Sequence, residues 1–236
     1  MTTVAVLQSN YLPWKGYFDL IHDADLFIFH DDLQYTKNDW RNRNRIKTPQ
    51  GSQWLSIPVG TDQNRLICEV VINDPSWQAK HWKRIRECYA RCPYFSTYQP
   101  FFEEVYCGRQ WTSLSDLNQH LIRLISREFL QIRTELRDSR EYAISGRKLD
   151  RLIDQVLKAG GTKYISGPAA KAYIDPARFA DAGIELAWKD YAGYPDYSQL
   201  HPPFEHGVSI LDLLFNVGPD APWYIWGWRD QDRGGY

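Results

Sequence analysis

Residues 4–29 read VAVLQSNYLPWKGYFDLIHDADLFIF, and this stretch decides the fold class. The apolar runs at 4–7 and 26–29 have the composition of buried strands. Between them, Pro13 can start a helix whose apolar residues recur at helical spacing over 17–24. Strand, helix and strand within about 30 residues predict a βαβ unit and a parallel sheet with right-handed crossovers.

The rest of the chain continues this alternation of apolar runs and amphipathic segments. It predicts an α/β fold in which a Rossmann-like, mostly parallel sheet is flanked by helices, followed by a small C-terminal helical and extended portion. We expect a single domain over 1–236, with its core over about 1–190 and the C-terminal extension over about 191–236. Further strands are expected at 54–58, 66–72, 164–166 and 184–188, and helices at 77–91, 117–128, 147–159, 176–182 and 210–215.

Composition and charge argue against several classes of protein. The 28 Lys and Arg residues nearly balance the 29 Asp and Glu residues, so no net field would attract nucleic acid or a membrane surface. Residues 1–8 lack the basic segment and the apolar length of a signal peptide or membrane span, so we expect a cytoplasmic protein. The four cysteines form no Cys-x-x-Cys pair and are too few for a disulfide framework. We expect them to be reduced thiols.

Aromatic residues make up 15% of the chain, with ten Trp and fifteen Tyr. Such rings suit stacking on sugars, bases or other flat ligands, but they also fill cores, and both interpretations stay open. The chain has neither a Gly-x-Gly-x-x-Gly fingerprint nor a Gly-x-x-x-x-Gly-Lys-Ser/Thr loop, which argues against a standard dinucleotide or P-loop site. The six histidines lack the His-x-x-x-His and His-Glu-x-x-His spacings, so we expect no metal site.

Two polar loops, at 8–17 and 30–45, follow the first two predicted strands. In a parallel sheet ligands bind beyond the carboxyl ends of the strands, where both loops begin. Carboxylates, an amide and a ring converge within 31–35, and the arginines of 41–45 supply forked donors for a phosphate or carboxylate. A solvated surface loop is the alternative for such a charge run. Gly16 either admits a ligand to the helix start or allows tight packing against the sheet.

Further motifs accompany the two loops in order along nearly the whole chain. They are Trp54–Pro58, Trp77-x-x-Lys-His-Trp82, Pro93-Tyr-Phe95, Tyr164–Pro168, and Leu211–Asn216 with Gly218-Pro219. Together with the loops, they resemble the WbqC-like protein family. That family is found with bacterial genes for surface polysaccharides and sugar modification. The resemblance implies a role in modifying an amino sugar or a nucleotide-linked sugar.

A second similarity rests on Pro13-x-x-Gly16 between the first two strands and on Asp31-Asp-Leu-Gln-Tyr35 after the second. This order is similar to pantothenate synthetase and the wider nucleotidylyltransferase fold. In pantothenate synthetase, ATP activates a carboxylate that is then joined to an amine. The similarity implies that Gln34 grips the carboxylate substrate and that residues 165–168 fall near the nucleotide loop.

The chain departs from those enzymes where they carry a histidine pair that stabilises phosphates. Trp14 and Tyr17 stand there instead, and neither ring supplies a cation. Lys15 or Arg43 could take over that role. The sequence therefore requires no cofactor, and it leaves open whether ATP or an acyl donor is used.

We expect a transferase that forms an amide or ester on an amino sugar or nucleotide-linked sugar. The alternatives are a non-catalytic sugar or nucleotide-sugar binding protein and an ATP-dependent carboxylate–amine ligase. Asp32 would be the general base for the amine, unless it is an N-cap or an ion-pair partner of Arg41, and Arg43 would meet developing negative charge. The expected partner is a small molecule and not a nucleic acid, while the oligomeric state is left undecided. The expected substrate-binding residues are Gln8, Asn10, Tyr11, Lys15, Tyr17, Asp31, Gln34, Tyr35, Asn42, Asn44, Arg45, Ser166, Gly167 and Lys171.

Overall fold

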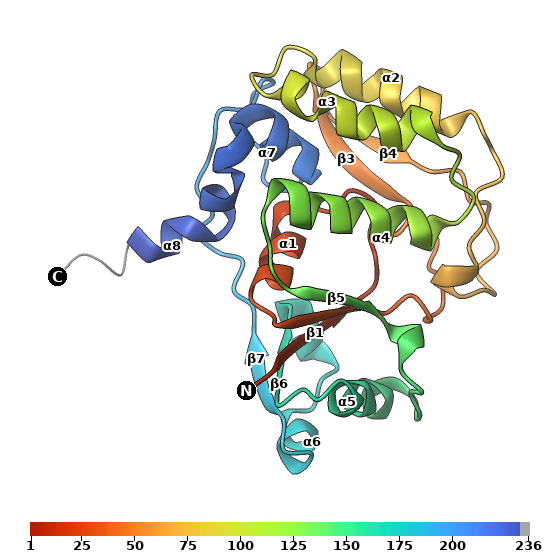
Figure 1. Cartoon of the computed structure of the whole chain (residues 1–236), viewed down its shortest axis with the longest axis vertical. Helices are drawn as coiled ribbons and strands as arrows, with labels where there is room; N and C mark the ends of the chain where they lie inside the picture. The colour runs from red at the N-terminus through yellow and green to blue at the C-terminus, as the bar shows by residue number, and fades with distance from the viewer. Residues whose placement is uncertain (232–236) are drawn as a thin grey trace.

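Five parallel strands form the central sheet of the computed structural model, which describes residues 1–231 (Figure 1). The strand order is β5-β2-β1-β6-β7, so the chain starts in the middle of the sheet, builds one side and then crosses to the other. This order confirms the predicted Rossmann-like fold, and its topological switch point lies between β1 and β6. The strands are β1 (Thr3–Leu7), β2 (Leu26–Phe29), β5 (Glu135–Asp138), β6 (Lys163–Ser166) and β7 (Glu185–Trp188).

Alternate residues of β1 and β2 face opposite layers, as the pleat of a strand requires. Ala5 and Phe27 pack in the larger apolar cluster, on the side of the helix that joins the two strands. Val6 and Ile28 pack in a smaller cluster on the other side. Both faces of the sheet are therefore buried, which explains the uninterrupted apolar runs in the sequence. The connecting helix is α1 (Lys15–His22), and the other side is covered by α5 (Lys148–Lys158) and α6 (Pro176–Asp181).

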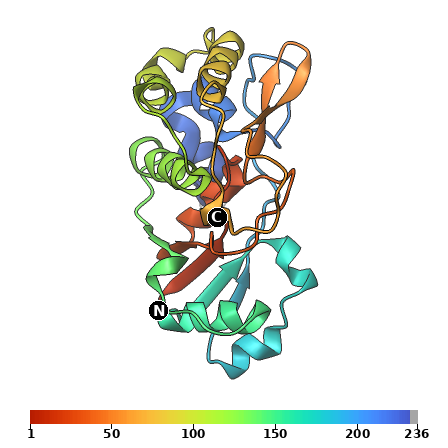
Figure 2. The ribbon, with the colours of Figure 1, turned by 90° about the vertical axis from the view of Figure 1, so that its right-hand side faces the viewer.

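Most of the remaining helices, together with an antiparallel hairpin, gather on the α1 side of the sheet (Figure 2). The expected C-terminal portion contributes to this core, because Phe215 is fully buried and its ring lies 5.1 Å from that of Phe95. Residues 232–236 of that portion lie outside the described residues. The elements are β3 (Arg43–Thr48), β4 (Gly51–Ser56), α2 (Trp77–Tyr89), α3 (Phe95–Glu103), α4 (Leu114–Leu124), α7 (Ile210–Val217) and α8 (Trp228–Gln231).

Short 3-10 and π-helical turns complete the backbone. Within residues 1–231, no helix combines the length and the apolar character needed to cross a membrane. The short turns are η1 (Ile67–Glu69), η2 (Glu104–Gly108), η3 (Ile125–Phe129), η4 (Ser139–Glu141), η5 (Pro168–Ala172), η6 (Gly218–Asp220) and η7 (Trp223–Gly227).

Two expectations about single elements are wrong. Residues 66–72 form no strand, because η1 interrupts them and only isolated bridges join Leu66 to Gln34 and Val71 to Ser113. The expected loop over 30–45 is a loop only in its first part, because its last residues enter β3 and pair with β4. The expected helices at 77–91, 147–159 and 210–215 are confirmed as α2, α5 and α7.

Candidate functional site

The carboxyl ends of β1, β2 and β6 surround a cavity of about 610 Å³, which we call the strand-end cavity. It lies at the topological switch point, where ligands bind in sheets of this order. Its volume is within the range of about 300–1,000 Å³ that is typical of small-molecule sites. The lining residues are Val6, Leu7, Gln8, His30, Leu33, Lys148, Leu149, Arg151, Leu152, Tyr164, Ser166 and Tyr173.

Asp32 follows β2 by three residues, and three side chains surround its carboxylate. Ser139 donates a hydrogen bond from Oγ to Oδ1 at 2.5 Å, and Arg151 donates to Oδ2 from the first turn of α5. Nε2 of His30 lies 3.6 Å from Oδ1. The ion-pair partner of Asp32 is therefore Arg151 and not Arg41, whose guanidinium lies 3.6 Å from a carboxylate oxygen of Asp39 instead.

His30 is the titratable group that best fits a proton acceptor in this cavity. Burial lowers its pKa from 6.5; Asp32 opposes this shift and Arg151 adds to it. The imidazole is therefore neutral at pH 7. Among residues 1–231, nothing lies within hydrogen-bond distance of its buried Nε2, which faces Asp32 at 3.6 Å. If Nε2 carries the hydrogen toward that carboxylate, Nδ1 is the nitrogen left to accept a proton.

A few polar groups interrupt the apolar lining of the strand-end cavity. Gln8 and Ser166, both predicted substrate-binding residues, line it from the ends of β1 and β6. Tyr164 donates from its hydroxyl to Oγ of Ser166 at 3.4 Å. Lys148 brings an exposed cation to the same cavity at the start of α5. Apolar walls with a few fixed polar groups are the usual composition of a small-molecule site.

The structure separates part of the predicted set into a second cavity of about 310 Å³, between the loop after β1 and the β3–β4 hairpin, which we call the hairpin cavity. Asn10, Asn44 and Arg45 line it, whereas none of the three lines the strand-end cavity. The guanidinium of Arg45 is already engaged, at 2.9 Å from a carboxylate oxygen of Glu205 and 2.8 Å from the carbonyl oxygen of Gly207.

The three predicted tyrosines are buried, and their hydroxyls are occupied inside the protein. Tyr11 shares a hydrogen bond of 2.9 Å with Nδ1 of His81, and Tyr17 donates to a backbone carbonyl at 3.0 Å. Tyr35 donates to Oδ1 of Asn42 at 3.1 Å. These residues hold the two loops in place and have no free polar group for a ligand.

Asp31 and the two predicted asparagines also serve the backbone of these loops. The fully buried carboxylate of Asp31 accepts from the backbone amide of Ser9 at 2.8 Å and from Oγ of Ser115 at 2.5 Å. Asn42 donates to the carbonyl of residue 57 at 2.9 Å, and Asn44 donates to the carbonyl of residue 12 at 2.8 Å. The polar residues of the two loops thus fall into two groups: those that hold the loops in place and a smaller number that line the cavities.

The remaining predicted residues lie at the periphery. The guanidinium of Arg43 lies 4.2 Å from the ring centroid of Trp54, on the hairpin. Gln34 is exposed and donates to a backbone carbonyl at 3.2 Å. Gly167 directly follows β6, and Lys171 is exposed on η5. None of these four lines the strand-end cavity.

Lys15 lies at the start of α1 and is only 3% exposed. Its Nζ faces the rings of Tyr194 and Tyr197, at 4.8 and 5.5 Å from their centroids. Burial lowers the pKa of Lys15 to about 8, against the opposing charge of Asp196. This ammonium is enclosed by rings and lies apart from both cavities.

Sequence reasoning missed His30, Ser139, Lys148 and Arg151. The signal for His30 was available, since it directly follows β2 at the sheet edge where Gln8 follows β1. Lys148 and Arg151 give no comparable signal, because cations on an amphipathic helix look the same whether they face solvent or a cavity.

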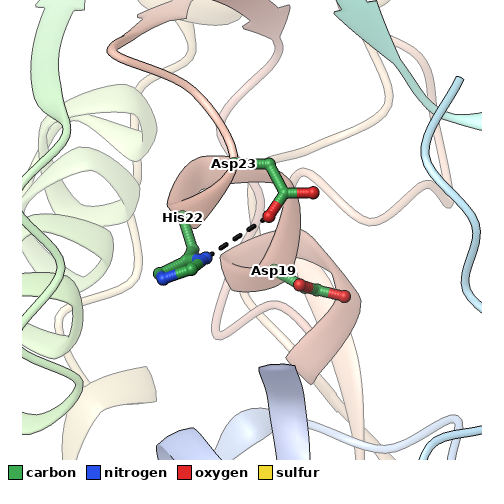
Figure 3. Close-up of side chains that lie close together, drawn as sticks. All are labelled: Asp19, His22 and Asp23. Carbon is green, nitrogen blue, oxygen red and sulfur yellow. Dashed lines mark hydrogen bonds and ion pairs between the residues drawn. The ribbon is translucent and has the colours of Figure 1, made fainter. Parts of the chain in front are cut away.

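Asp19 and His22 on α1 and Asp23, which directly follows this helix, bring ligand atoms within 4.8 Å of one another, as a metal site would (Figure 3). The carboxylates are already paired with protein cations, however. Lys189 Nζ lies 2.7 Å from Asp19 and 2.5 Å from Asp23, and Arg229 binds Asp19 through two hydrogen bonds of 2.9 and 2.7 Å. This cluster therefore ties α1 to the end of β7 and to α8.

Comparison with known proteins places the chain in a family. The model of the WbqC-like protein family matches residues 8–224. This range includes every residue that lines the hairpin cavity and all but Val6 and Leu7 of those that line the strand-end cavity. The chain belongs to the WbqC-like protein family. This WbqC-like protein is 45% identical over 227 residues to the uncharacterised protein Rv1507c of Mycobacterium tuberculosis, a match that covers 95% of this chain and 98% of the relative. No solved structure matches it.

Proposed function

We propose that this WbqC-like protein is a transferase that attaches an acyl group to the amino group of a sugar, free or nucleotide-linked, in the strand-end cavity. The observation that carries the proposal is the neutral imidazole of His30, which lines the cavity beside Asp32. Amide formation needs a base, because an ammonium must lose a proton before it attacks. In this proposal His30 is the base and Asp32 orients it.

The reaction balances with an acyl thioester as the donor. The amine nitrogen attacks the carbonyl carbon, the new C–N bond forms and the C–S bond breaks. Two protons must leave an ammonium: the first goes to solvent before the attack, and the second leaves the nitrogen for Nδ1 of His30 as the C–N bond forms and passes to the departing thiolate. Lys148 and Arg151 place positive charge beside the cavity, where it would stabilise a developing oxyanion or the phosphates of a nucleotide-linked sugar.

Activation of a carboxylate by ATP has less support. The indole of Trp14 covers the start of α1, since a Cβ added to Gly16 would lie 2.3 Å from its Cζ2. The hydroxyl of Tyr17 is used in a backbone hydrogen bond. The helix start that could otherwise receive phosphate groups is therefore covered by the chain itself.

The proposal takes the protein to act in the cytoplasm, in bacterial polysaccharide or sugar modification. Its four cysteines, Cys68, Cys88, Cys92 and Cys107, are free. Free thiols are the normal state of cysteines in a reducing compartment.

An assay of thiol release tests the proposal. Acetyl-coenzyme A is mixed with amino sugars, free or linked to uridine diphosphate, and the free thiol and acylated sugar are measured. His30→Gln should lower turnover by about 10²–10⁴ without changing the melting midpoint. His120→Gln, which alters a partly buried histidine outside the cavity, should stay within about twofold of the wild type. Equal turnover in wild type and His30→Gln, or sugar binding without turnover, would contradict the proposal.

A further inference from the structure

We propose that the hairpin cavity is a second binding site, which takes the ring of an uncharged sugar. Two tryptophans, Trp14 and Trp40, line a cavity of about 310 Å³ together with Pro13. An indole offers a broad flat face that suits the C–H groups of a pyranose ring. The volume lies at the lower end of the range of about 300–1,000 Å³ for ligand sites, as expected for a single small ring.

The accessible wall of this cavity is held in position by contacts with neighbouring side chains. Trp40 is 42% exposed, so a ligand can reach it. Its ring centroid lies 5.4 Å from that of Trp54, and the guanidinium of Arg43 lies 4.2 Å from the Trp54 ring. The backbone carbonyl of Trp40 also accepts from the amide of Tyr11 at 3.0 Å. Such a pre-positioned ring loses little conformational entropy when a ligand binds.

The polar groups of the hairpin cavity favour a neutral ligand. Arg45 is the only cation in its lining within residues 1–231, and the carboxylate of Glu205 lies 2.9 Å from it. A phosphate or carboxylate would have to compete with that carboxylate, whereas a hydroxyl would not. Asn10 accepts from Arg41 through Oδ1, and no described residue accepts a hydrogen bond from its Nδ2. This amide nitrogen is a donor for a sugar hydroxyl.

The two cavities lie on one short segment of chain. Gln8 lines the strand-end cavity and Asn10 lines the hairpin cavity. Arg41 contacts both, donating to Oε1 of Gln8 at 3.3 Å and to Oδ1 of Asn10. A sugar of more than one ring could therefore place its amino sugar in the first cavity and a neighbouring ring in the second. This last interpretation rests on the proposed function, whereas binding in the hairpin cavity does not.

Fluorine NMR on protein labelled with 5-fluorotryptophan tests the site directly. The probes are N-acetylglucosamine, its β-1,4-linked dimer, lactose and maltose, with uridine monophosphate as the charged comparison. The Trp40 resonance is assigned as the signal missing from Trp40→Phe. We expect it to shift with at least one neutral sugar, and Trp40→Ala should weaken that sugar's binding in calorimetry by about tenfold or more, equivalent to about 1.4 kcal/mol.

Matched variants separate this site from the proposed activity. Trp223→Ala removes another exposed tryptophan, away from the cavity, and should leave sugar affinity within about twofold. His30→Gln should bind the sugar as the wild type does, even if the proposed transferase activity proves absent. Failure of every neutral sugar to move the Trp40 signal, preference for uridine monophosphate, or unchanged binding in a folded Trp40→Ala would overturn the proposal.

Discussion

Nε2 of His30 lies 3.6 Å from Oδ1 of Asp32, the oxygen that also accepts from Oγ of Ser139. The carboxylate raises the pKa of His30 against the larger effect of burial. Asp32→Asn keeps the shape of the side chain and removes its charge, so the pKa of His30 should fall further below 6.5. The acid limb of the pH–rate profile should move to lower pH. The plateau rate at higher pH should drop, because the base is weaker and poorly oriented. An NMR titration of the His30 ring checks the shift.

Asp39→Asn is the matched control for that variant, because it removes a half-buried carboxylate that lies near Arg41 and outside the strand-end cavity. It should leave the His30 titration and the pH–rate profile unchanged. A His30 pKa that rises in Asp32→Asn would show that the carboxylate does not act on the imidazole as described.

His81 should make the protein sensitive to mild acid. Burial lowers its pKa to about 4, and its ring shares hydrogen bonds with the Tyr11 hydroxyl and the carbonyl of Ser56. The unfolded chain therefore binds this proton first, near pH 6.5, and stability is lost as pH falls from 6.5 toward 4. The loss at pH 5 should be about 2 kcal/mol relative to neutral pH. Urea unfolding at pH 7 and pH 5 measures it.

His81→Gln should flatten this pH dependence, whatever its effect on stability at pH 7. His22→Gln, at an exposed position, should retain the wild-type slope. If the unfolding free energy of His81→Gln depends on pH as strongly as that of the wild type, other groups cause the acid sensitivity.

Asp19→Ala should be strongly destabilising. The fully buried carboxylate neutralises Lys189 and Arg229, and Lys189 itself is only 5% exposed. Removing one member of a buried ion-pair network typically costs about 3–5 kcal/mol. For a chain of this size that lowers the melting midpoint by roughly 6–20 °C. Glu185→Ala breaks an exposed pair with Lys163 and should cost about 1 kcal/mol or less. Equal losses of unfolding free energy in the two variants would show that the buried network around Asp19 contributes no more stability than the exposed pair.

Gly16→Ala should disturb the hairpin cavity through Trp14. A Cβ at this position would lie 2.3 Å from Cζ2 of the indole, so the ring must move. We expect a loss of about 1–3 kcal/mol in unfolding free energy, as for other overpacked sites, together with weaker sugar binding. Gly227→Ala, where the nearest atom would lie 3.5 Å away, is the control and should be nearly neutral. If Gly16→Ala still binds sugar as the wild type does, Trp14 does not contribute to the sugar site.

The sequence predicts four of the five strands of the sheet, including the edge strand β7, and misses only the edge strand β5. β1 and β2 are buried on both faces, and their apolar runs are readable without a structure. β5 cannot be recognised in this way, because it alternates buried Leu136 with exposed Glu135 and Arg137. The two exposed side chains form an ion pair of 2.5 Å. A four-residue segment with three charged residues has the composition of a surface turn.

Only part of the candidate site could be predicted from the sequence. The ends of β1 and β2 could be located because parallel strands carry their loops at one edge of the sheet. The sequence could not show that Asn10 and Gln8 line different cavities, because this separation depends on the antiparallel pairing of β3 with β4. That pairing brings Arg45 opposite Trp54, and no local pattern in residues 41–45 reveals it.

The central position of β1 has a consequence for how the chain is synthesised. Thr3 pairs with Lys163, and Asp19 meets Arg229 at a separation of 210 residues. A ribosome that adds about 5–20 residues per second leaves Asp19 without this cation for roughly 10–40 s. Until Lys163 is made, the nascent first half presents an open edge of β1, and until Arg229 is made, Asp19 lacks this counter-charge. Chaperones that shield exposed strand edges are therefore expected to engage this protein before its last helix leaves the exit tunnel.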